Sequence, residues 1–326
     1  MVNESLTAAI RKKAADLGFS RVGITRATVP ENDQHHFIEW LDRGYHASMA
    51  WMVQNRDKRR DPTQLLPGAK SVVCVALNYY TDVPHSEDVH CGKISRYAWG
   101  DDYHHIVGSK LEHLLAFVTS SGSGISGKIY VDTGPVMEKA LAQRAGIGWV
   151  GKHTNLITAE AGSWVFLGEL LLDVELAYDQ PATDQCGNCT LCLEACPTQA
   201  IVEPYVLNAN LCISYLTIEN RGIMPDELAG KFDRWIYGCD ICQDVCPWNL
   251  NGARPTLEPG FLPRDCNRAP GLEEIASLSE AEFQKRYRGS AMKRAKLNGL
   301  RRNAEFILAS KNAESKKNQS NNHDNQ

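Results

Sequence analysis

The sequence has no apolar run long enough to cross a membrane. No stretch of its 326 residues approaches the roughly 18 consecutive apolar residues that a transmembrane helix requires. The first residues, MVNESLTAAIRKKAADLGF, are amphipathic and charged, and they lack the apolar core of a secretory signal peptide. These absences predict a cytoplasmic protein without a membrane partner, in which the eleven cysteines are thiols or metal ligands rather than disulfides.

Nucleotide fingerprints are also missing. No G-x-G-x-x-G motif follows a predicted strand, and there is no Walker loop. The formal net charge of −4 gives no overall signal for nucleic acid. The segment DDYHHIVG nearly matches the D-x-H-x-x-G loop that supplies an axial histidine to cobalamin, but Val107 stands where the glycine is required. We therefore interpret His104 as a residue at a helix start, with Asp101 or Asp102 as the helix cap.

Closely spaced cysteines are what the sequence does contain. CGNCTLCLEACP, residues 186–197, has the C-x2-C-x2-C-x3-C-P spacing of bacterial ferredoxins, in which three thiolates bind one iron–sulfur cluster and the fourth binds another. Zinc sites usually use two separated C-x-x-C pairs, and disulfide frameworks belong to short secreted chains. The run therefore predicts two clusters and requires a second set of cysteines.

The second set lies in CDICQDVCPWN, residues 239–249. Ile236 stands where a local fourth ligand would be, and Cys212 is the nearest free candidate. The crossed ligation of two-cluster ferredoxins then predicts cluster one on Cys186, Cys189, Cys192 and Cys246, and cluster two on Cys196, Cys212, Cys239 and Cys242. Cys74, Cys91 and Cys266 remain as ordinary thiols, of which Cys74 lies in the apolar run SVVCVAL and is expected in the core.

Hydrophobic periodicity divides the chain into four regions. Strand-like and helix-like segments alternate to about residue 178 and are followed by the linker AYDQPATDQ. We predict an α/β domain at 1–178, a cluster domain at 179–256, a basic helical region at 257–310 and a disordered tail at 311–326. Predicted elements include a buried strand over SVVCVALNYY, a helix from Pro135 and a β-hairpin over NLITAEAGSWVFLGELLLDVEL.

Asp132 ends a predicted strand, GKIYVDTGP, before a Gly-Pro turn into a helix. Ligand-facing residues collect at the carboxyl ends of strands in α/β folds. An aspartate at this point can instead cap the following helix. Position alone therefore leaves two interpretations open: a general acid whose pKa is raised by burial, or a helix cap.

A basic segment follows the cysteines. Between residues 285 and 302 there is no acidic residue, and the basic residues are Lys285, Arg286, Arg288, Lys293, Arg294, Lys296, Arg301 and Arg302. Such a local face suits phosphate groups on an otherwise acidic protein, although a solvated surface would have the same pattern.

Six segments of the chain resemble the epoxyqueuosine reductase family. They are RYAWGDDYH, VDTGPVMEKALAQRAGIGWVGKHTNLI, CGNCTLCLEACPTQAI, NANLCISYLTIENRG, GCDICQDVCPWN and RAKLNGLRRNA. The resemblance implies a mixed fold, α+β or α/β, with an N-terminal cobalamin-binding domain similar to nitroreductases and reductive dehalogenases. A bacterial-type two-cluster ferredoxin domain and a short C-terminal helical region, a truncated form of the HEAT-like repeats in many members, would follow.

The resemblance implies an oxidoreductase of queuosine biosynthesis. Its substrate would be tRNA, in which an epoxide on the modified wobble guanosine is reduced to the cyclopentene. Cobalamin would do the reductive chemistry with electrons from two 4Fe–4S clusters, and Asp132 would be the proton donor. The alternatives are a small-molecule reductase similar to reductive dehalogenases, which would not need the basic face, and a non-catalytic ferredoxin carrier, which would not need the N-terminal domain.

The resemblance also implies contact residues and partners. Those expected at the cobalamin are Arg60, Ser95, Asp132, Leu156, Ser214, Asp240 and Ile241. Those expected at the tRNA are Arg221, Arg286, Lys293, Arg294, Lys296 and Arg301. An external electron donor of the flavodoxin or ferredoxin type would reduce the clusters of a monomeric enzyme.

Overall fold

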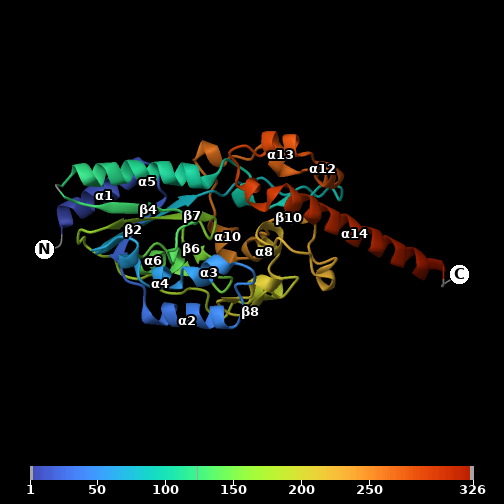
Figure 1. The fold of residues 1–326 in the computed structure, drawn as a ribbon, viewed down its shortest axis with the longest axis horizontal. Coiled ribbons are helices and arrows are strands. Elements are labelled where there is room, and N and C mark those ends of the chain that lie inside the picture. The colour runs from blue at the N-terminus through green and yellow to red at the C-terminus, as the bar shows by residue number, and fades with distance from the viewer. Residues whose placement is uncertain (1–2, 123, 324–326) are drawn as a thin grey trace.

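The computed structural model describes residues 3–122 and 124–323. Figure 1 shows an elongated molecule, with a sheet between layers of helices at one end and the cysteine-rich and C-terminal segments at the other. No helix within the described ranges is long and apolar enough to cross a bilayer.

A four-stranded antiparallel sheet forms the centre of the N-terminal region. Its strands, in spatial order, are β1 (Arg21–Arg26), β2 (Ser71–Asn78), β7 (Val165–Leu172) and β4 (Gly127–Tyr130). The buried strand predicted over SVVCVALNYY is confirmed as β2, which is buried from Ser71 to Leu77. A strand this apolar is expected only where both faces of a sheet are covered.

Helices cover both faces of the sheet (Figure 1). On one face α1 (Glu4–Asp16) and α5 (Tyr103–Ser120) pack over Val73 and Val75, and on the other α6 (Glu138–Arg144) packs over Cys74. Cys74 is fully buried, so its expected place in the core is confirmed. The remaining helices of this region are α2 (Glu31–Asp42), α3 (Ala50–Gln54) and α4 (Arg56–Arg60).

The predicted β-hairpin over residues 155–176 is wrong. β6 (Leu156–Ile157) pairs with β5 (Trp149–Val150) in a separate ribbon, whereas β7 belongs to the main sheet. The two strands of the ribbon come very close at Gly148, where a Cβ atom would lie 2.1 Å from the carbonyl oxygen of Ile157. A glycine at this point permits that close approach, and β7 pairs instead with β2 and β4.

The cysteine-rich region is built of short elements. They are α7 (Leu191–Glu194), β8 (Ile201–Glu203), β9 (Val206–Leu207), α8 (Ile213–Ile218), β10 (Trp235–Tyr237), α9 (Ile241–Asp244) and α10 (Pro247–Gly252). The one-turn helices α7 and α9 pack against each other, and each lies inside one cysteine motif. β10 pairs in parallel with β3 (Lys93–Ile94), so backbone hydrogen bonds join this region to the N-terminal one.

Four helices close the chain: α11 (Asp265–Arg268), α12 (Leu272–Ser277), α13 (Glu280–Arg286) and α14 (Lys296–His323). The first half of α14 packs on α12 and places Leu297, Leu300 and Ala304 in the core. Our expectation of a disordered tail from residue 311 differs from this structure, in which α14 continues to His323. Residues 300–323 contain no glycine or proline, the two residues that most disfavour a helix interior, so the sequence permits the continued helix. Residues 324–326 lie outside the described residues.

Candidate active site

Two cavities are framed by the eight cysteines of the two motifs. The first has a volume of about 450 Å³, and its cysteines are Cys186, Cys189, Cys192 and Cys246. The second has a volume of about 350 Å³, and its cysteines are Cys196, Cys212, Cys239 and Cys242. These are the same two sets of four that crossed ligation predicts, and each set draws on both motifs.

The donor sets fit iron–sulfur clusters chemically. Burial raises the pKa of Cys239 and Cys242 well above the ordinary thiol value, and the neighbouring cysteines raise it further. Several buried thiols this close cannot all ionise unless a cationic centre binds them. Among the described residues, no three His, Cys, Asp or Glu side chains are close enough to hold a single metal ion. The thiols surround spaces that suit a larger group.

Residues around the first cavity also fit a cluster. Lys152 is buried, and its Nζ donates to the carbonyl oxygens of Gly187 at 2.6 Å and Cys189 at 2.9 Å, which fixes the first cysteine loop. The indole of Trp149 packs beside Cys186 and Cys246, and a hydrogen bond from this indole to the Cys186 thiol opposes the effect of burial, which raises the pKa of that thiol. Buried N–H groups are normally paired, so Trp149 fits a sulfur acceptor inside this cavity.

A larger cleft adjoins the second cavity. It has a volume of about 1020 Å³ and is lined by residues of α3, α5, α6 and the segment before α14. Five residues line both spaces: Tyr97, Tyr103, Asp132, Glu138 and Lys139. The cavity and the cleft together form one passage from four cysteines, past Asp132, to the surface. Its size and its apolar wall of Leu156, Phe166 and Ile241 fit a large flat organic group.

Asp132 is held in an unusual conformation within this passage. It lies two residues after β4 with φ of 55°, in the left-handed region that non-glycine residues rarely adopt, at a cost of about 1–3 kcal/mol. Its backbone N–H donates to Oε1 of Glu138 at 2.6 Å. Its carboxylate accepts from the Tyr103 hydroxyl at 2.7 Å, and Nε2 of His104 lies 3.5 Å away. Such strain is typical of functional sites.

The helix-cap interpretation of Asp132 is wrong. The residue before α6 is Met137, which makes no side-chain cap bond, and the Asp132 carboxylate points to α5 instead. The cap predicted for α5 is confirmed, because Asp102 accepts from the His104 backbone N–H at 3.0 Å. Asp102 also contacts Nδ1 of His104 at 2.7 Å, so this imidazole lies between two carboxylates.

The expected raised pKa of Asp132 is not found in this geometry. Burial raises its pKa, but hydrogen bonds from His104 and Tyr103 and the positive charges of His104 and Lys139 outweigh burial and lower it. The same contacts, against the opposing effect of burial, raise the pKa of His104 to about 9. At neutral pH the proton therefore lies on His104, beside an ionised Asp132 that is partly open to solvent.

Two further carboxyl groups lie behind Asp132. Glu169 of β7 is completely buried, and its carboxyl group hydrogen-bonds with that of Glu138. Burial and the nearby Glu138 raise the pKa of Glu169 well above its ordinary value, and burial and Asp132 raise the pKa of Glu138 to about 7. Two buried carboxylates this close would repel each other, so ionising both is unfavourable. The pair therefore retains a proton at neutral pH.

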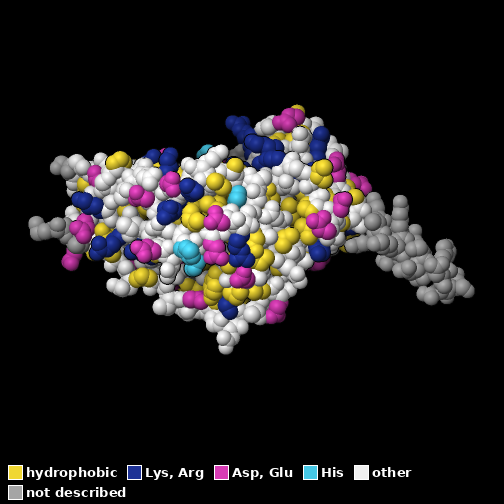
Figure 2. All heavy atoms as spheres, turned by 60° about the horizontal axis from the view of Figure 1, so that its bottom comes forward, with side chains coloured by type: hydrophobic (Ala, Val, Ile, Leu, Met, Phe, Trp, Pro, Cys, Tyr) yellow, Lys and Arg dark blue, Asp and Glu magenta, His cyan; other side chains and the backbone are white. Residues whose placement is uncertain are grey.

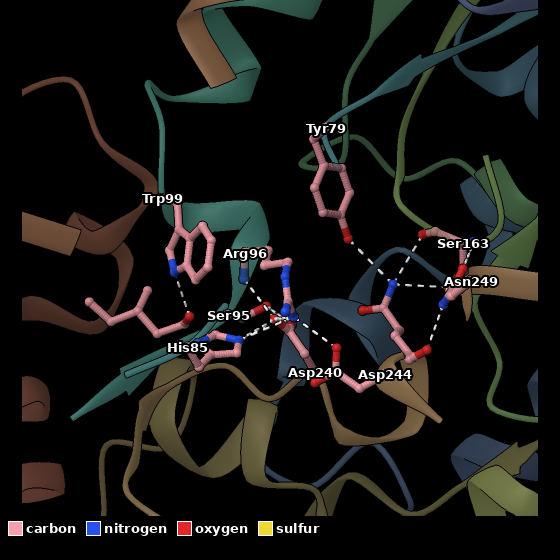
Figure 3. A network of polar contacts seen from close by, with 11 residues as sticks. Tyr79, His85, Ser95, Arg96, Trp99, Ser163, Asp240, Asp244 and Asn249 are labelled. Carbon is pink, nitrogen blue, oxygen red and sulfur yellow. Dashed lines mark hydrogen bonds and ion pairs between the residues drawn. The ribbon is translucent and has the colours of Figure 1, made fainter. Parts of the chain in front are cut away.

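Asp240 lies outside the passage, in the polar network of Figure 3. Its carboxylate is completely buried and accepts from the Ser95 hydroxyl, from the Arg96 backbone N–H at 2.9 Å and from the Arg96 guanidinium at 3.2 Å. The same guanidinium reaches Asp244 at 2.8 Å. Asp240 therefore holds the second cysteine motif against η2 (Arg96–Ala98), and it can act on a cofactor only through the residues it positions.

The other predicted cofactor residues fall into two groups. Ser95, Leu156, Ser214 and Ile241 line the second cavity, as does Asp132. Arg60 does not lie there: it is exposed, donates to Gln34 at 3.2 Å and borders a separate shallow pocket. Its neighbour Arg59 lines the large cleft and donates to the Val136 carbonyl at 3.1 Å. A pair of adjacent arginines in the sequence could not reveal which one turns inward.

The six residues predicted to contact tRNA fall into two groups: three line the large cleft and three bond to other groups of the protein. Lys293, Arg294 and Lys296 line the large cleft, and the Arg294 guanidinium lies 5.4 Å from the ring centre of Trp51. The other three donate to groups within the protein: Arg221 to the Arg294 carbonyl, Arg286 to Glu274 and Arg301 to the Leu278 carbonyl. Figure 2 shows a group of Lys and Arg side chains at the upper edge of the molecule, with further Lys and Arg side chains among apolar and acidic ones across the rest of that face.

Two cysteine-framed cavities, the second of which adjoins a cleft that holds His104 and the strained Asp132, define an iron–sulfur oxidoreductase. A family model described as a 4Fe-4S double cluster binding domain matches residues 185–249, and one described as Epoxyqueuosine reductase QueG, DUF1730, matches residues 59–133. An epoxyqueuosine reductase from Synechocystis sp. is 49% identical over 290 residues, covering 88% of this chain and 100% of that protein. One from Cellulophaga algicola is 43% identical over 91% of this chain and 96% of that protein. The chain belongs to the epoxyqueuosine reductase family.

Solved structures of the family confirm the predicted mixed fold. An epoxyqueuosine reductase crystallised with an epoxyqueuosine-modified tRNA-Tyr stem loop has a TM-score of 0.87 and 35% identity, covering 94% of this chain and 81% of that one. The Bacillus subtilis enzyme, in a structure with its catalytic aspartate loop swung out of the active site, has a TM-score of 0.85 and 34% identity over 94% of this chain and 82% of that one.

Proposed function

We propose that this enzyme reduces epoxyqueuosine to queuosine at the wobble position of tRNA, with cobalamin as the reactive cofactor and two 4Fe–4S clusters as electron carriers. The observation that carries the proposal is the passage in which four cysteines, an apolar cavity, Asp132 and a wide basic-edged cleft follow one another. A family member crystallised with a modified tRNA stem loop supports the substrate. Cluster one would use Cys186, Cys189, Cys192 and Cys246, and cluster two Cys196, Cys212, Cys239 and Cys242.

The cobalamin would lie in the second cavity against Leu156, Ser214, Ile241 and Ser95. When bound, it supplies a metal centre that passes electrons to the epoxide carbon framework. Asp240 would act by holding Ser95, through the hydroxyl that its carboxylate accepts. Arg60 remains a proposed contact only for a part of the cofactor that extends beyond the cavity, and Arg59 is the better placed of the two arginines.

The side chains around Asp132 would supply the protons that the reaction consumes. Converting an epoxide to an alkene and water consumes two electrons and two protons, and the oxygen leaves only when it is protonated. His104 holds a proton beside the Asp132 carboxylate, and Tyr103 orients that carboxylate through its hydroxyl. We assign proton donation to Asp132, with His104 as the group that holds the proton until the substrate enters and excludes water.

The tRNA would lie across the large cleft. Lys293, Arg294 and Lys296 offer positive charge to phosphates, and Trp51, which is 36% exposed, offers a face for a base. Arg221, Arg286 and Arg301 would support this surface from within, because their guanidinium groups already donate to carbonyl or carboxylate groups of the protein.

Reconstitution under anaerobic conditions tests the proposal. The full chain, loaded with iron, sulfide and cobalamin, should hold about eight iron atoms, as two 4Fe–4S clusters require, and should convert epoxyqueuosine in a tRNA stem loop to queuosine, measured by mass spectrometry of the digested nucleosides. Free epoxyqueuosine nucleoside and a halogenated phenol serve as controls. Equal turnover of the nucleoside would argue against the tRNA substrate, and turnover of the phenol alone would favour the dehalogenase-like alternative.

A further inference from the structure

His153 stands between the two cysteine-framed cavities. It follows β5 in the segment GKHT, is 4% exposed, and is the one described residue that lines both cavities. Of the residues next to it in the sequence, Lys152 lines only the first cavity and Thr154 lines only the second. No role for His153 follows from the cysteine pattern or from the chemistry at Asp132.

The hydrogen bonds of the ring fix which nitrogen carries the proton. Nδ1 accepts the backbone N–H of Asn155 at 3.2 Å, so Nδ1 has a lone pair and the N–H is on Nε2. Nε2 is buried and has no acceptor among the described residues. Burying an N–H without a partner is unfavourable, so this donor is expected to have an acceptor that belongs to the loaded protein.

The surroundings limit what that acceptor can be. The charged group that acts on the ring is the Lys139 ammonium, which cannot accept a hydrogen bond. Lys152, the adjacent cation, is occupied by the carbonyls of Gly187 and Cys189. The two spaces that the ring touches each contain four cysteine side chains, so cluster sulfide and cysteine sulfur are the acceptors that would fill them.

We propose that His153 donates an N–H···S hydrogen bond from Nε2 to a sulfur of one of the two iron–sulfur clusters, at the point where the clusters approach each other. The inference rests on the proposed clusters and assigns His153 as a positioning residue for electron transfer between them. A hydrogen bond to sulfur stabilises the reduced, more negative cluster and raises its reduction potential. His153 thereby makes one cluster easier to reduce than its bare thiolate ligands would.

An anaerobic redox titration followed by EPR tests the inference on the full chain. His153→Leu removes the donor, whereas His153→Gln places an amide N–H near the position of Nε2. His113→Leu is the matched control, because His113 is an exposed histidine on α5 that lines neither cavity. We expect His153→Leu to lower the one-electron reduction constant of one cluster about tenfold, or about 59 mV. His153→Gln should recover most of the shift, and His113→Leu should match the wild type.

Unchanged midpoints of both clusters in His153→Leu, with full iron content, would overturn the inference and leave an ordered water as the partner of Nε2. Because the leucine variant could lose a cluster, pulsed EPR of reduced wild type with 15N-labelled histidine gives an independent reading. A histidine nitrogen coupling that disappears in His153→Gln supports the hydrogen bond, and no such coupling in the wild type overturns it. A wild type without EPR-active clusters would overturn the proposed function itself, and iron analysis shows this before any variant is compared.

Discussion

At the scale of single residues, Asp132 is fixed by contacts that are far apart in the sequence. Its backbone conformation depends on Glu138 of α6, and its carboxylate depends on Tyr103 and His104 of α5. The carboxylate therefore cannot leave its place without breaking its contacts with α5, and the backbone cannot move without breaking the bond to α6. This arrangement suits a group that must meet a reacting oxygen in a defined position.

Asp132→Asn should lower conversion of epoxyqueuosine tRNA by about 10²–10⁴-fold, because the amide keeps the size but cannot take up the proton that His104 holds and pass it to the substrate. Cobalamin content and both clusters should persist. The measurement is single-turnover conversion under saturating reductant, with cofactor occupancy checked by absorbance. Asp61→Asn is the control, since Asp61 caps a short helix away from the cleft. Near-normal conversion by a fully loaded Asp132→Asn variant would remove the proton-donor role.

The pH dependence should follow His104. Its pKa is raised to about 9 by Asp102 and Asp132, so the protonated form is present at neutral pH and is lost as pH rises through about 9. We expect single-turnover rates to decline over that range in the wild type, and His104→Gln to be slow without the decline. A wild-type rate that stays flat from pH 7 to about pH 10 would exclude His104 as the proton reservoir.

The buried carboxyl pair should make the protein less stable as pH rises. The unfolded chain releases these protons above about pH 4.5, whereas the folded chain keeps them, to about pH 7 at Glu138. Stability is therefore lost from about pH 4.5 upward, by up to about 1.4 kcal/mol per pH unit for each proton. Between pH 5 and about 6.5, below the range in which His104 adds its own loss, Glu169→Gln should flatten this slope.

Urea unfolding at fixed ionic strength measures that slope. Glu112→Gln, which changes an exposed carboxyl on α5, should leave it as in the wild type. An unchanged slope in Glu169→Gln would mean that Glu169 is ionised in the folded protein.

At the scale of elements, α7 and α9 bring the two cysteine motifs together. Each helix is one turn long, so its stability depends on packing and on the clusters rather than on its own hydrogen bonds. Cys246 and Cys212 each line a cavity with cysteines that are distant in sequence, and this grouping explains why no motif is complete alone.

Cys246→Ser should damage cluster one, and Cys212→Ser should damage cluster two. Cys266→Ser, which changes a thiol outside both cavities, is the control and should leave both intact. Iron content and the EPR signal of each cluster provide the measurement. If Cys212→Ser retained both clusters and full activity, Cys212 would not be a ligand.

The sequence was sufficient for elements with a strong local signal. The apolar run of β2, the cap at Asp102 and the grouping of the eight cysteines follow from periodicity, side-chain chemistry and spacing. The sequence was insufficient where contacts between distant residues determine strand pairing or the pKa of a side chain. β6 pairs with β5 because β7 is held by β2 and β4 and glycine at 148 permits a close approach, and the pKa of Asp132 falls because α5 brings His104 to it. Neither contact has a local signature.

At the scale of the whole molecule, the cleft lies between the N-terminal region and the segment that precedes α14. Trp51 on α3 and Arg294 on the opposite side meet across it. Two of the three basic side chains in this wall, Lys293 and Lys296, have no acidic partner among the ion pairs of the described residues. Arg294 differs, because its Nε–H donates a hydrogen bond to the Glu219 carboxylate at 2.6 Å, and this carboxylate neutralises part of its charge.

The Lys293→Glu, Lys296→Glu double variant should therefore weaken binding of the tRNA stem loop, and it should flatten the salt dependence. Each lost phosphate contact removes about 0.7–0.9 from the slope of log affinity against log salt. Lys285→Glu is the matched control, because it reverses an exposed charge of the same basic segment outside the cleft. Affinity measured by fluorescence anisotropy at several salt concentrations separates two models. Equal weakening by Lys285→Glu would indicate a diffuse positive field, whereas a loss confined to the double variant would locate the phosphates at the cleft that contains Asp132.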